Sequence, residues 1–497
     1  MNQVLEKNLT ELKHKQIDPW ALGYHIQSKS GWINDPNGLC FHKGRYHVFF
    51  QHHPHTPKWG PMHWGHVSST DLIHWEHHPI ALTPGDEGMC FSGSAVSVGD
   101  ELALIYTGHK WLKEDHNDDY MVQHQCLATS KDGVNFQKKG IVIASAYNSE
   151  IVHFRDPKVW NENNAWHMVV GVKENDQGKV AYYRSDNLEQ WEFINILGTA
   201  DAKRDEGYMW ECPDFFKLGD KHILICSPQG MSSNQYERRN LFQNGYFVGQ
   251  FNVVNGEFSR GNFKELDYGH DFYACQTFLD DEGRRIAIAW MDMWESAMPE
   301  QAFGRAGALT IPRELTIDKL GHIYQKPVAE LKKLRKKLLL LENKKTYQQG
   351  KTKEKIEGIH LEINLSIQLP SDMNKTNEEK VNSFERSGIL LRCGNGQHTY
   401  VGYDAMQQRV FVDRNHSGAG VSGIRYTPQI NTKNLDTLTF QIFIDSSSIE
   451  VFVNNGQFTL SSRIYPNLNS QGIEFISENG ITNILDLSIY ELECTTT

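Results

Sequence analysis

The sequence lacks a long apolar segment. None of its 497 residues belongs to an apolar run of about 18 residues, the length that a membrane-spanning helix requires. The first residues, Met1–Lys7, also lack the charged and then apolar order of a secretory signal peptide. We therefore expect a cytoplasmic protein that does not contact a membrane.

Cysteine shows no pattern of a disulfide or metal scaffold. The chain has eight cysteines, and no two of them have CxxC spacing. They stand at positions 40, 90, 126, 212, 226, 275, 393 and 494. A disulfide framework or a zinc site is not expected, and the default for each cysteine is a reduced thiol in the protein core.

Several catalytic signatures are missing as well. The chain contains no HExxH motif, no glycine-rich phosphate loop and no G-x-S-x-G nucleophile elbow. Ten histidines lie between His42 and His78, but neither His63/His66 nor the group at positions 52, 53 and 55 has an evident further ligand. A polar lining of a sugar pocket, or ordinary strand positions, explains these histidines better than a metal site does. We expect no metal and no cofactor.

The charge balance excludes another class of function. A net charge of −11 at pH 7 argues against general nucleic-acid binding. With 39% hydrophobic and 22% charged residues, the composition is typical of a globular protein, and 497 residues are too many for one compact core. The 12 Trp, 19 Tyr and 24 Phe offer faces that suit sugar rings, although aromatic residues more often fill β-sheet cores.

The chain divides into four parts. Residues 1–25 are expected to form a short polar helix and a lead-in. From 26 to 330, short β-like runs are broken by Gly, Pro, Asp and Asn, and no convincing amphipathic helix appears, which indicates an all-β domain. Residues 331–345 are rich in lysine and are interpreted as a solvated connector in preference to an anion-binding helix. Alternating strands return at 346–497 and predict a β-sandwich.

A repeat runs through residues 26–330. Strand-like runs open at five positions spaced by 56, 64, 56 and 62 residues, and about three more β runs follow each opening. The openings are Asp35, Phe91, Arg155, Glu211 and Tyr273. Similar heptapeptides at 69–75, 130–136 and 185–191 support the same period. Four strands per unit, repeated five times, predict a five-bladed β-propeller.

In a propeller, these openings would meet at one end of the central channel. Asp35, Asp156 and Glu211 would then face one another, although they lie far apart in the sequence. Asp35 and Asp156 directly precede a proline, and Glu211 stands two residues before one. All three lie in stretches with turn composition, so a purely structural role in turns is the alternative. Candidate walls of the pocket are Phe91, Ser92, Tyr273 and Trp290.

Clustered carboxylates suit glycoside hydrolysis. A retaining enzyme uses two carboxyl groups about 5 Å apart: one stays ionised and attacks, and the other is protonated and donates to the leaving oxygen. A third carboxylate helps, because like charges raise the pKa of the most buried group. Arg155, next to Asp156, is expected to keep that Asp ionised and oriented. Spacing does not decide which carboxylate has which role.

Five stretches of the sequence resemble, in the same order, the motifs of glycoside hydrolase family 32. They are Trp32–Gly38, Phe91–Ser94, Phe154–Pro157, Glu211–Asp214 and Pro312–Leu315. The resemblance runs from about residue 20 to the C-terminus. The family includes invertases, fructan hydrolases and bacterial sucrose-6-phosphate hydrolases, and it implies a five-bladed propeller followed by a β-sandwich.

The resemblance also implies the roles of individual residues. Asp35 would be the nucleophile that forms a fructosyl-enzyme, Glu211 the acid/base, and Asp156 the residue that holds fructosyl hydroxyls and stabilises the transition state. The substrate-binding residues would be Trp32, Ile33, Asn34, Gln51, Trp59, Phe91, Ser92, Arg155, Tyr273 and Trp290. Ile33 replaces a common Met, and Arg305 stands where the family commonly has an aromatic residue; Arg305 is interpreted as a surface residue, with a leaving-group or phosphate contact as the alternative.

The predicted function is a retaining β-fructofuranosidase that acts on sucrose 6-phosphate or sucrose. Residues Gly207–Trp210, just before Glu211, look most like the bacterial sucrose-6-phosphate group. Two alternatives stay open: a fructan hydrolase or fructosyltransferase of the same fold, and a non-catalytic glycan-binding propeller. The expected partner is a small sugar, and the expected state is a monomer or homodimer.

Overall fold

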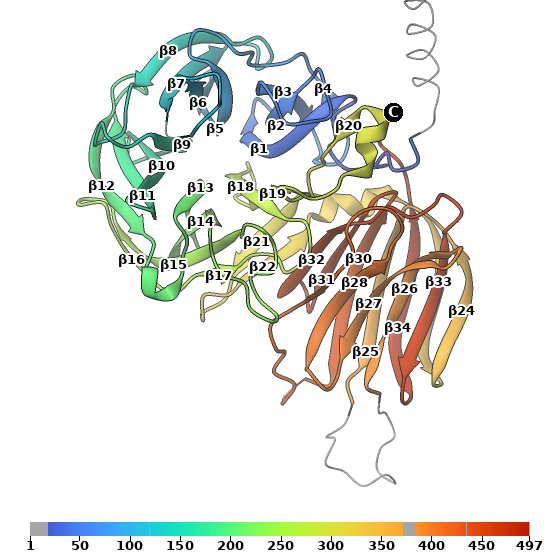
Figure 1. Cartoon of the computed structure of the whole chain (residues 1–497). Helices are drawn as coiled ribbons and strands as arrows, with labels where there is room; N and C mark the ends of the chain where they lie inside the picture. The colour runs from blue at the N-terminus through green and yellow to red at the C-terminus, as the bar shows by residue number, and fades with distance from the viewer. Residues whose placement is uncertain (1–17, 119, 371–383, 434, 497) are drawn as a thin grey trace, which may run out of the picture.

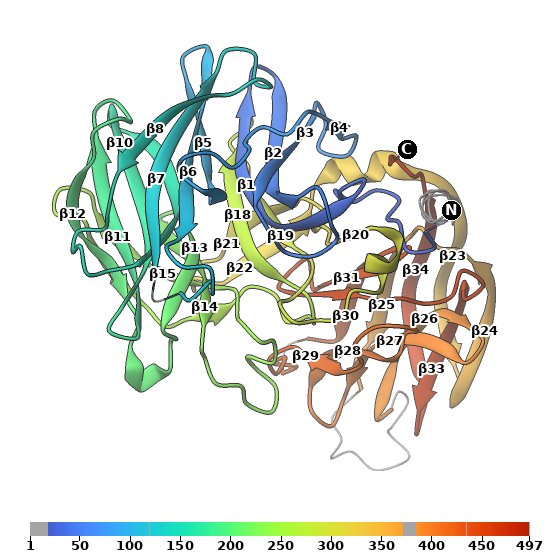
Figure 2. The same cartoon turned by 45° about the horizontal axis from the view of Figure 1, so that its top comes forward.

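The computed structural model describes residues 18–118, 120–370, 384–433 and 435–496. The short helix expected near the N-terminus lies outside the described residues. A ring of sheets contains the strands up to Pro327, and a two-layered body contains those that follow (Figure 1). The two bodies lie side by side (Figure 2). They contact each other through strands β22 and β32, which are labelled in Figure 1.

Five antiparallel sheets form the blades of the ring in the described part of the chain. Blade 1 contains β1 (Gly31–His42), β2 (Arg45–His53), β3 (His63–Ser69) and β4 (Glu76–His77). Blade 2 contains β5 (Met89–Val98), β6 (Glu101–Trp111), β7 (Met121–Ser130) and β8 (Gln137–Ile143). Blade 3 contains β9 (His153–Glu162), β10 (Ala165–Glu174), β11 (Gln177–Ser185) and β12 (Glu192–Thr199).

Blades 4 and 5 complete the ring. Blade 4 contains β13 (Met209–Leu218), β14 (Lys221–Gln229), β15 (Gly245–Asn252), β16 (Glu257–Arg260) and the short β17 (Lys264–Glu265). Blade 5 contains β18 (Tyr273–Leu279), β19 (Arg285–Trp290), β21 (Arg313–Ile317) and β22 (Ile323–Pro327). The short 3₁₀ helices are η1 (Ala202–Arg204), η2 (Pro299–Phe303) and η3 (Ala329–Leu334). The first strands, β1, β5, β9, β13 and β18, surround the axis and contact one another in a closed ring (Figure 1).

A segment between β19 and β21 of blade 5 joins the last blade of the ring to the first. Strand β20 (Arg305–Ala306) pairs in parallel with β1, with Gly31 opposite Arg305. Further along, the backbone N–H of Leu309 donates to the carbonyl of Ile26 at 2.9 Å, and Gln27 pairs with Ala308. The first and last blades are therefore joined by backbone hydrogen bonds.

Each first strand contains an irregularity where the sequence predicted an opening. The pairing of β1 shifts between Ile33 and Pro36, and that of β13 shifts between Glu211 and Asp214. Equivalent shifts lie after Phe91 in β5, beside Arg155 in β9 and after Tyr273 in β18. Proline has no N–H for the ladder, so it is tolerated in strands at bulges, and a bulge re-aims the neighbouring side chains. These bulges turn the predicted site residues toward the channel.

Two six-stranded sheets form the sandwich. One has the order β23 (Arg335–Tyr347), β34 (Thr482–Leu492), β25 (Leu361–Gln368), β30 (Thr437–Asp445), β31 (Ser448–Val453) and β32 (Phe458–Arg463). The other has β24 (Gly350–Glu357), β33 (Gly472–Glu478), β26 (Arg386–Gly394), β27 (Gln397–Asp404), β28 (Arg409–His416) and β29 (Ile424–Tyr426). A buried hydrophobic cluster that includes Ile363, Val401 and Val451 fills the space between them. The predicted fold, a five-bladed propeller followed by a sandwich, is confirmed.

The lysine-rich stretch interpreted as a connector is a strand of the sandwich. Residues 335–347 form β23, which pairs with β34 over most of its length. Because β23 is the edge strand of its sheet, its outer face is solvated, and lysines are common on such edges. The interpretation of residues 335–345 as a connector was wrong, because the lysines lie on an edge strand. The connector is limited to the short helix η3 that precedes it.

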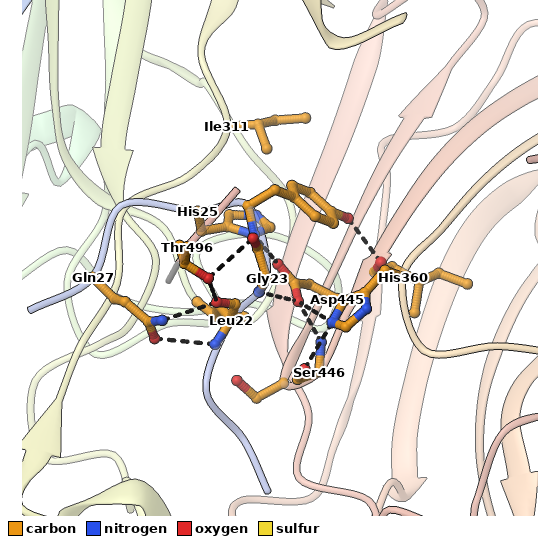
Figure 3. Close-up of polar contacts among 12 residues, drawn as sticks. Leu22, Gly23, His25, Gln27, Ile311, His360, Asp445, Ser446 and Thr496 are labelled. Carbon is orange, nitrogen blue, oxygen red and sulfur yellow. Dashed lines mark hydrogen bonds and ion pairs between the residues drawn. The ribbon is translucent and has the colours of Figure 1, made fainter. Parts of the chain in front are cut away.

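The lead-in residues are held between the two bodies. The carboxylate of Asp445 accepts hydrogen bonds from the backbone N–H groups of Gly23 at 2.7 Å and Tyr24 at 3.2 Å (Figure 3). The hydroxyl of Thr496 donates to the carbonyl of Leu22 at 2.6 Å. A Cβ at Gly23 would lie 2.9 Å from the sulfur of Cys494, so only glycine fits this approach. Residues 22–26 of the segment are thus buried and held by hydrogen bonds to the sandwich and to the C-terminal residues.

His25 lies at the centre of this interface as a buried cation. Its Nδ1 contacts Asp445 at 2.7 Å and its Nε2 contacts Glu450 at 2.9 Å. Burial alone would lower the pKa of His25, but the two carboxylates outweigh it and raise the pKa to about 9. The imidazolium form therefore dominates at neutral pH and bridges the lead-in to the sandwich.

This ion pair predicts a loss of stability in mild alkali. The folded-state pKa of His25 is above its unfolded value of 6.5, so its contribution is complete below pH 6.5 and is lost as the pH rises through 9. Between pH 7 and pH 9 the free energy of unfolding should fall by about 2 kcal/mol through this group. Urea unfolding at both pH values measures the change. A His25→Gln variant should lack this part of the pH dependence, and an identical slope in both proteins would contradict the assignment.

Candidate active site

Three carboxylates converge at one end of the propeller channel. Asp35 comes from β1, Asp156 from β9 and Glu211 from β13, each at the bulge of its strand. All three line one pocket with a cavity volume of about 460 Å³. Cys212, the neighbour of Glu211, donates its backbone N–H to Asp156 at 2.9 Å and places its sulfur 3.4 Å from Asp35. Residues separated by more than 100 positions in the sequence are thus brought into contact.

Asp35 is buried and held by three donors. The hydroxyl of Ser92 donates to its Oδ2 at 2.6 Å, the amide of Asn34 donates to its Oδ1 at 3.0 Å, and the thiol of Cys212 contacts Oδ2. Burial raises the pKa of Asp35, the Ser92 hydrogen bond opposes this effect, and the charge of Glu211 adds to it. The carboxylate is therefore fixed in orientation and poorly solvated, as an attacking group requires.

Asp156 has a backbone conformation that few residues adopt. Its φ is +67°, and its N–H is satisfied by the hydroxyl of Thr107 at 2.9 Å. Burial raises the pKa of Asp156 to about 7; the charge of Arg155 opposes this shift, whereas those of Glu211 and Asp35 increase it. Near neutral pH, the group of three carboxyls therefore retains a proton, which one of its members can donate.

Glu211 is the most firmly oriented of the three. Arg155 donates to its Oε1 from Nε at 3.1 Å and from Nη2 at 2.8 Å. Gln229 donates to Oε2 at 2.9 Å, and the hydroxyl of Tyr273 donates to the same oxygen at 2.5 Å. The sequence predicted that Arg155 keeps Asp156 ionised and oriented. Its charge does favour the ionised form of Asp156 by lowering the pKa of that group, but its guanidinium hydrogen bonds orient Glu211 instead.

Most of the predicted substrate-binding residues surround the carboxylates. Six of them line the pocket: Asn34, Gln51, Trp59, Phe91, Ser92 and Arg155. Two others, Tyr273 and Trp32, do not line the pocket but hydrogen-bond to residues that do. Tyr273 contacts Glu211, and the indole of Trp32 donates to the Asn34 side-chain oxygen at 2.7 Å. The site can therefore hold a polar ring against the carboxylates, with aromatic side chains around it.

Three sequence interpretations fail in the structure. Ile33 is fully buried in a core cluster with Val48, on the side of β1 that faces away from the pocket. Trp290 is fully buried behind Trp32, so it is not a wall of the pocket. Arg305 is neither a surface residue nor part of the pocket, because it is buried and its Nε donates to Asp18 at 2.6 Å.

Other residues that line the pocket were not identified from the sequence as site residues. They are His109, Trp111, Asp118, Met121, Gln123, His153, Lys173, Tyr208, Gln229 and Trp294. Most of them lie at the ends of second and third strands or in the hairpins between them. Of these residues, only Tyr208 belonged to a motif noted in the sequence, the tetrapeptide Gly207–Trp210 before Glu211.

Four histidines of blade 1, His42, His47, His53 and His66, are buried. The rings of His66 and Phe49 stack with centroids 4.1 Å apart, and His47 Nδ1 lies 3.1 Å from His66 Nε2. Burial lowers the pKa of His66 to about 2 and that of His47 to about 4, so both are neutral. Within the described ranges, no group of three or more His, Cys, Asp or Glu side chains has an arrangement that could hold a metal ion.

No helix in the described part of the chain is long and apolar enough to cross a membrane. This finding agrees with the absence of long apolar runs in the sequence.

Two family models together match nearly the whole chain. "Glycosyl hydrolases family 32 N-terminal domain" matches residues 25–327, and "Glycosyl hydrolases family 32 C terminal" matches residues 330–491. The two segments correspond to the propeller and the sandwich.

Curated proteins and solved structures show the same likeness. The chain is 41% identical to a sucrose-6-phosphate hydrolase of Escherichia coli, covering 97% of each chain. It is also 41% identical to a raffinose invertase of Escherichia coli, covering 97% of this chain and 98% of that protein. A mutant GH32 β-fructofuranosidase of Bombyx mori, solved in complex with sucrose, has a TM-score of 0.84 at 35% identity and covers 100% of this chain and 98% of that one. The resemblance seen in the sequence motifs is thereby confirmed.

Proposed function

The chain belongs to glycoside hydrolase family 32, and from this membership we propose that it is a retaining β-fructofuranosidase whose substrate is sucrose 6-phosphate. The observation that carries the proposal is the convergence of Asp35, Asp156 and Glu211 in one pocket. The names of relatives that are 41% identical over nearly the whole chain support the substrate. The products would be fructose and glucose 6-phosphate.

In the first step, Asp35 attacks the anomeric carbon of the fructosyl unit while Glu211 donates a proton to the glycosidic oxygen. The bond from that carbon to the glycosidic oxygen breaks, an ester to Asp35 forms, and glucose 6-phosphate leaves. The donors Ser92 and Asn34 hold Asp35 for this attack. The Cys212 N–H donates to only one carboxyl oxygen of Asp156, Oδ2. The other oxygen of Asp156 accepts hydrogen bonds from fructosyl hydroxyls.

In the second step, water replaces the leaving group. Glu211, now a carboxylate, takes a proton from the water as it attacks the same carbon. Asp35 is released and fructose forms with its original configuration. Arg155, Gln229 and Tyr273 keep Glu211 in one orientation through both proton transfers.

A comparison of substrates tests the proposal. Wild-type protein should hydrolyse sucrose 6-phosphate with a kcat/KM at least about 10-fold above that for sucrose, which corresponds to one additional favourable contact of about 1.4 kcal/mol. Raffinose and inulin should be poorer substrates than sucrose 6-phosphate. A strong preference for inulin, or transfer of fructose to sugars, would favour the fructan alternatives, and no release of glucose or glucose 6-phosphate would favour a binding role.

The location of the protein in the cytoplasm belongs to the same proposal. A sugar phosphate carries charge and does not cross a membrane unaided. The eight cysteines form no disulfide, and six of them are fully buried thiols, which fits a reducing compartment. Fractionation of cells should place the activity with cytoplasmic markers.

A further inference from the structure

The pocket contains a cation that the catalytic steps do not use. Its lining includes four carboxylates, Asp35, Asp118, Asp156 and Glu211, and two permanent cations, Arg155 and Lys173. The Arg155 guanidinium is already bonded to Glu211 through two N–H groups. Among the described residues, Lys173 has only Asp176 as an ion-pair partner, at 3.1 Å, and the Asp176 side chain is 86% exposed. Such a surface pair contributes little and is easily exchanged.

Two further donors lie beside Lys173. His153 is directly opposite Lys173 on the neighbouring strand, and the Lys173 Nζ lies 5.1 Å from the centre of the Tyr208 ring. All three side chains line the same cavity. We call Lys173, His153 and Tyr208 the Lys173 cluster.

The chemistry of His153 is fixed by Arg155. Burial and the positive charges of Arg155 and Lys173 lower the pKa of His153 to about 3, so the ring is neutral. Arg155 Nη1 lies 3.0 Å from His153 Nδ1, and because arginine only donates, Nδ1 must be the acceptor. The ring proton is therefore on Nε2, which has no hydrogen-bond partner among the described side chains and is free to donate to a ligand.

Tyr208 is held in place by its backbone. Its N–H donates to the carbonyl of Gln229 at 2.9 Å, and its ring rests against Gly230, where a Cβ would lie 2.3 Å from the ring. Only glycine permits this contact, because Gly230 also has a φ of +83°. Tyr208 therefore holds its hydroxyl in a fixed position in the pocket that Lys173 and His153 also line.

The cluster lies on the side of the pocket where the leaving group departs. Arg155 contacts both His153 and Glu211, and Gln229 contacts both Tyr208 and Glu211. A leaving group that receives its proton from Glu211 must therefore lie next to the cluster. Trp111 and Asp118 also line the pocket, and the Trp111 indole donates to Asp118 at 3.3 Å.

We propose that the Lys173 cluster binds the phosphate of the glucosyl 6-phosphate group and gives the enzyme its preference for the phosphorylated substrate. This inference rests on the proposed function. A phosphate monoester carries a charge of about −1.5 to −2 at pH 7 and would be repelled by the catalytic carboxylates if no cation met it. Lys173 supplies the charge, and His153 and Tyr208 supply neutral donors that add hydrogen bonds without competing for Glu211.

Substitution of Lys173 tests the inference. Lys173→Met should lower kcat/KM for sucrose 6-phosphate by about 10- to 100-fold, the range of one charge-assisted hydrogen bond, and change that for sucrose by less than about 3-fold. Lys173→Arg should keep most of the preference, and Tyr208→Phe should reduce it by a smaller factor. Lys139→Met, at an exposed position on the outer strand β8, is the matched control. The ratio of the two substrates is measured on one preparation, so partial loss of folded protein cancels.

Product inhibition gives a second readout. Glucose 6-phosphate should inhibit the wild-type enzyme more strongly than glucose does, and Lys173→Met should remove this difference. The inference would be overturned if Lys173→Met lowered kcat/KM equally for both substrates, or if it left the preference unchanged. Neither result would contradict the proposed fructosidase function. A wild-type enzyme with equal kcat/KM for both substrates would also overturn it. An enzyme that hydrolysed neither substrate would instead refute the proposed function on which the inference rests.

Discussion

Asp35→Asn should fold normally and lose at least about 10³-fold in kcat on sucrose 6-phosphate, the scale at which enzymes lose a member of a catalytic unit. The side chain keeps its shape, and Ser92 remains in place beside it. What is lost is the negative charge that forms the ester to the fructosyl carbon. Steady-state kinetics with a circular dichroism spectrum to establish folding measures the effect.

Two further variants separate the nucleophile from the acid. Glu211→Gln should be slow on sucrose 6-phosphate, but its first step should recover on a fructoside whose leaving group is acidic, such as 4-nitrophenol, because no proton is then needed. Asp35→Asn should not recover on that substrate. Ser92→Ala, which only removes a donor to Asp35, should lose far less. Near-normal turnover by Asp35→Asn would refute the assignment of the nucleophile.

Arg313→Met should lower the free energy of unfolding by about 3–5 kcal/mol, because it leaves the buried Asp267 without its cation and the buried Glu450 with His25 alone. The Arg313 side chain is 1% exposed and contacts Asp267 in the propeller at 3.1 Å and Glu450 in the sandwich at 2.5 Å. Urea unfolding at pH 7, followed by tryptophan fluorescence, measures the shift of the first transition.

An exposed ion pair provides the control. Arg45 contacts Glu76 at 2.6 Å, but the two side chains are 36% and 63% exposed. Arg45→Met should therefore cost less than about 1 kcal/mol. If Arg313→Met were as mild as Arg45→Met, the two domains would not depend on this buried network for their attachment.

The propeller and its three carboxylates could be predicted because they repeat. A period near 60 residues, with an acidic or aromatic residue beside a break in each first strand, is visible in the sequence, and prolines 36, 157 and 213 mark three of the breaks. In a closed ring, equivalent positions meet at the same end of the channel. The repeat thus carried spatial information that no single motif carried.

The parts that could not be predicted depend on local geometry. The family resemblance placed Ile33 among the substrate-binding residues, but the bulge after Ile33 interrupts the alternation of faces in β1, and Ile33 lies in the core. Lys173, His153 and Tyr208 carry no repeated spacing, and they meet only because a hairpin and a strand pairing place them together. Strand β23 resembled a linker because an edge strand has a polar outer face.

The pairing of residues 26–32 with residues 305–309 has a consequence for how the protein is made. Gln27 pairs with Ala308, which is synthesised 281 residues later. At roughly 5–20 residues per second, the ribosome reaches Ala308 only after tens of seconds. During that interval blade 1 has no neighbour on its open side, and Asp35 has no completed channel around it. The nascent chain therefore cannot cleave its substrate until the last blade has emerged, and the exposed edge of β1 is the part of the young chain that most needs protection from aggregation.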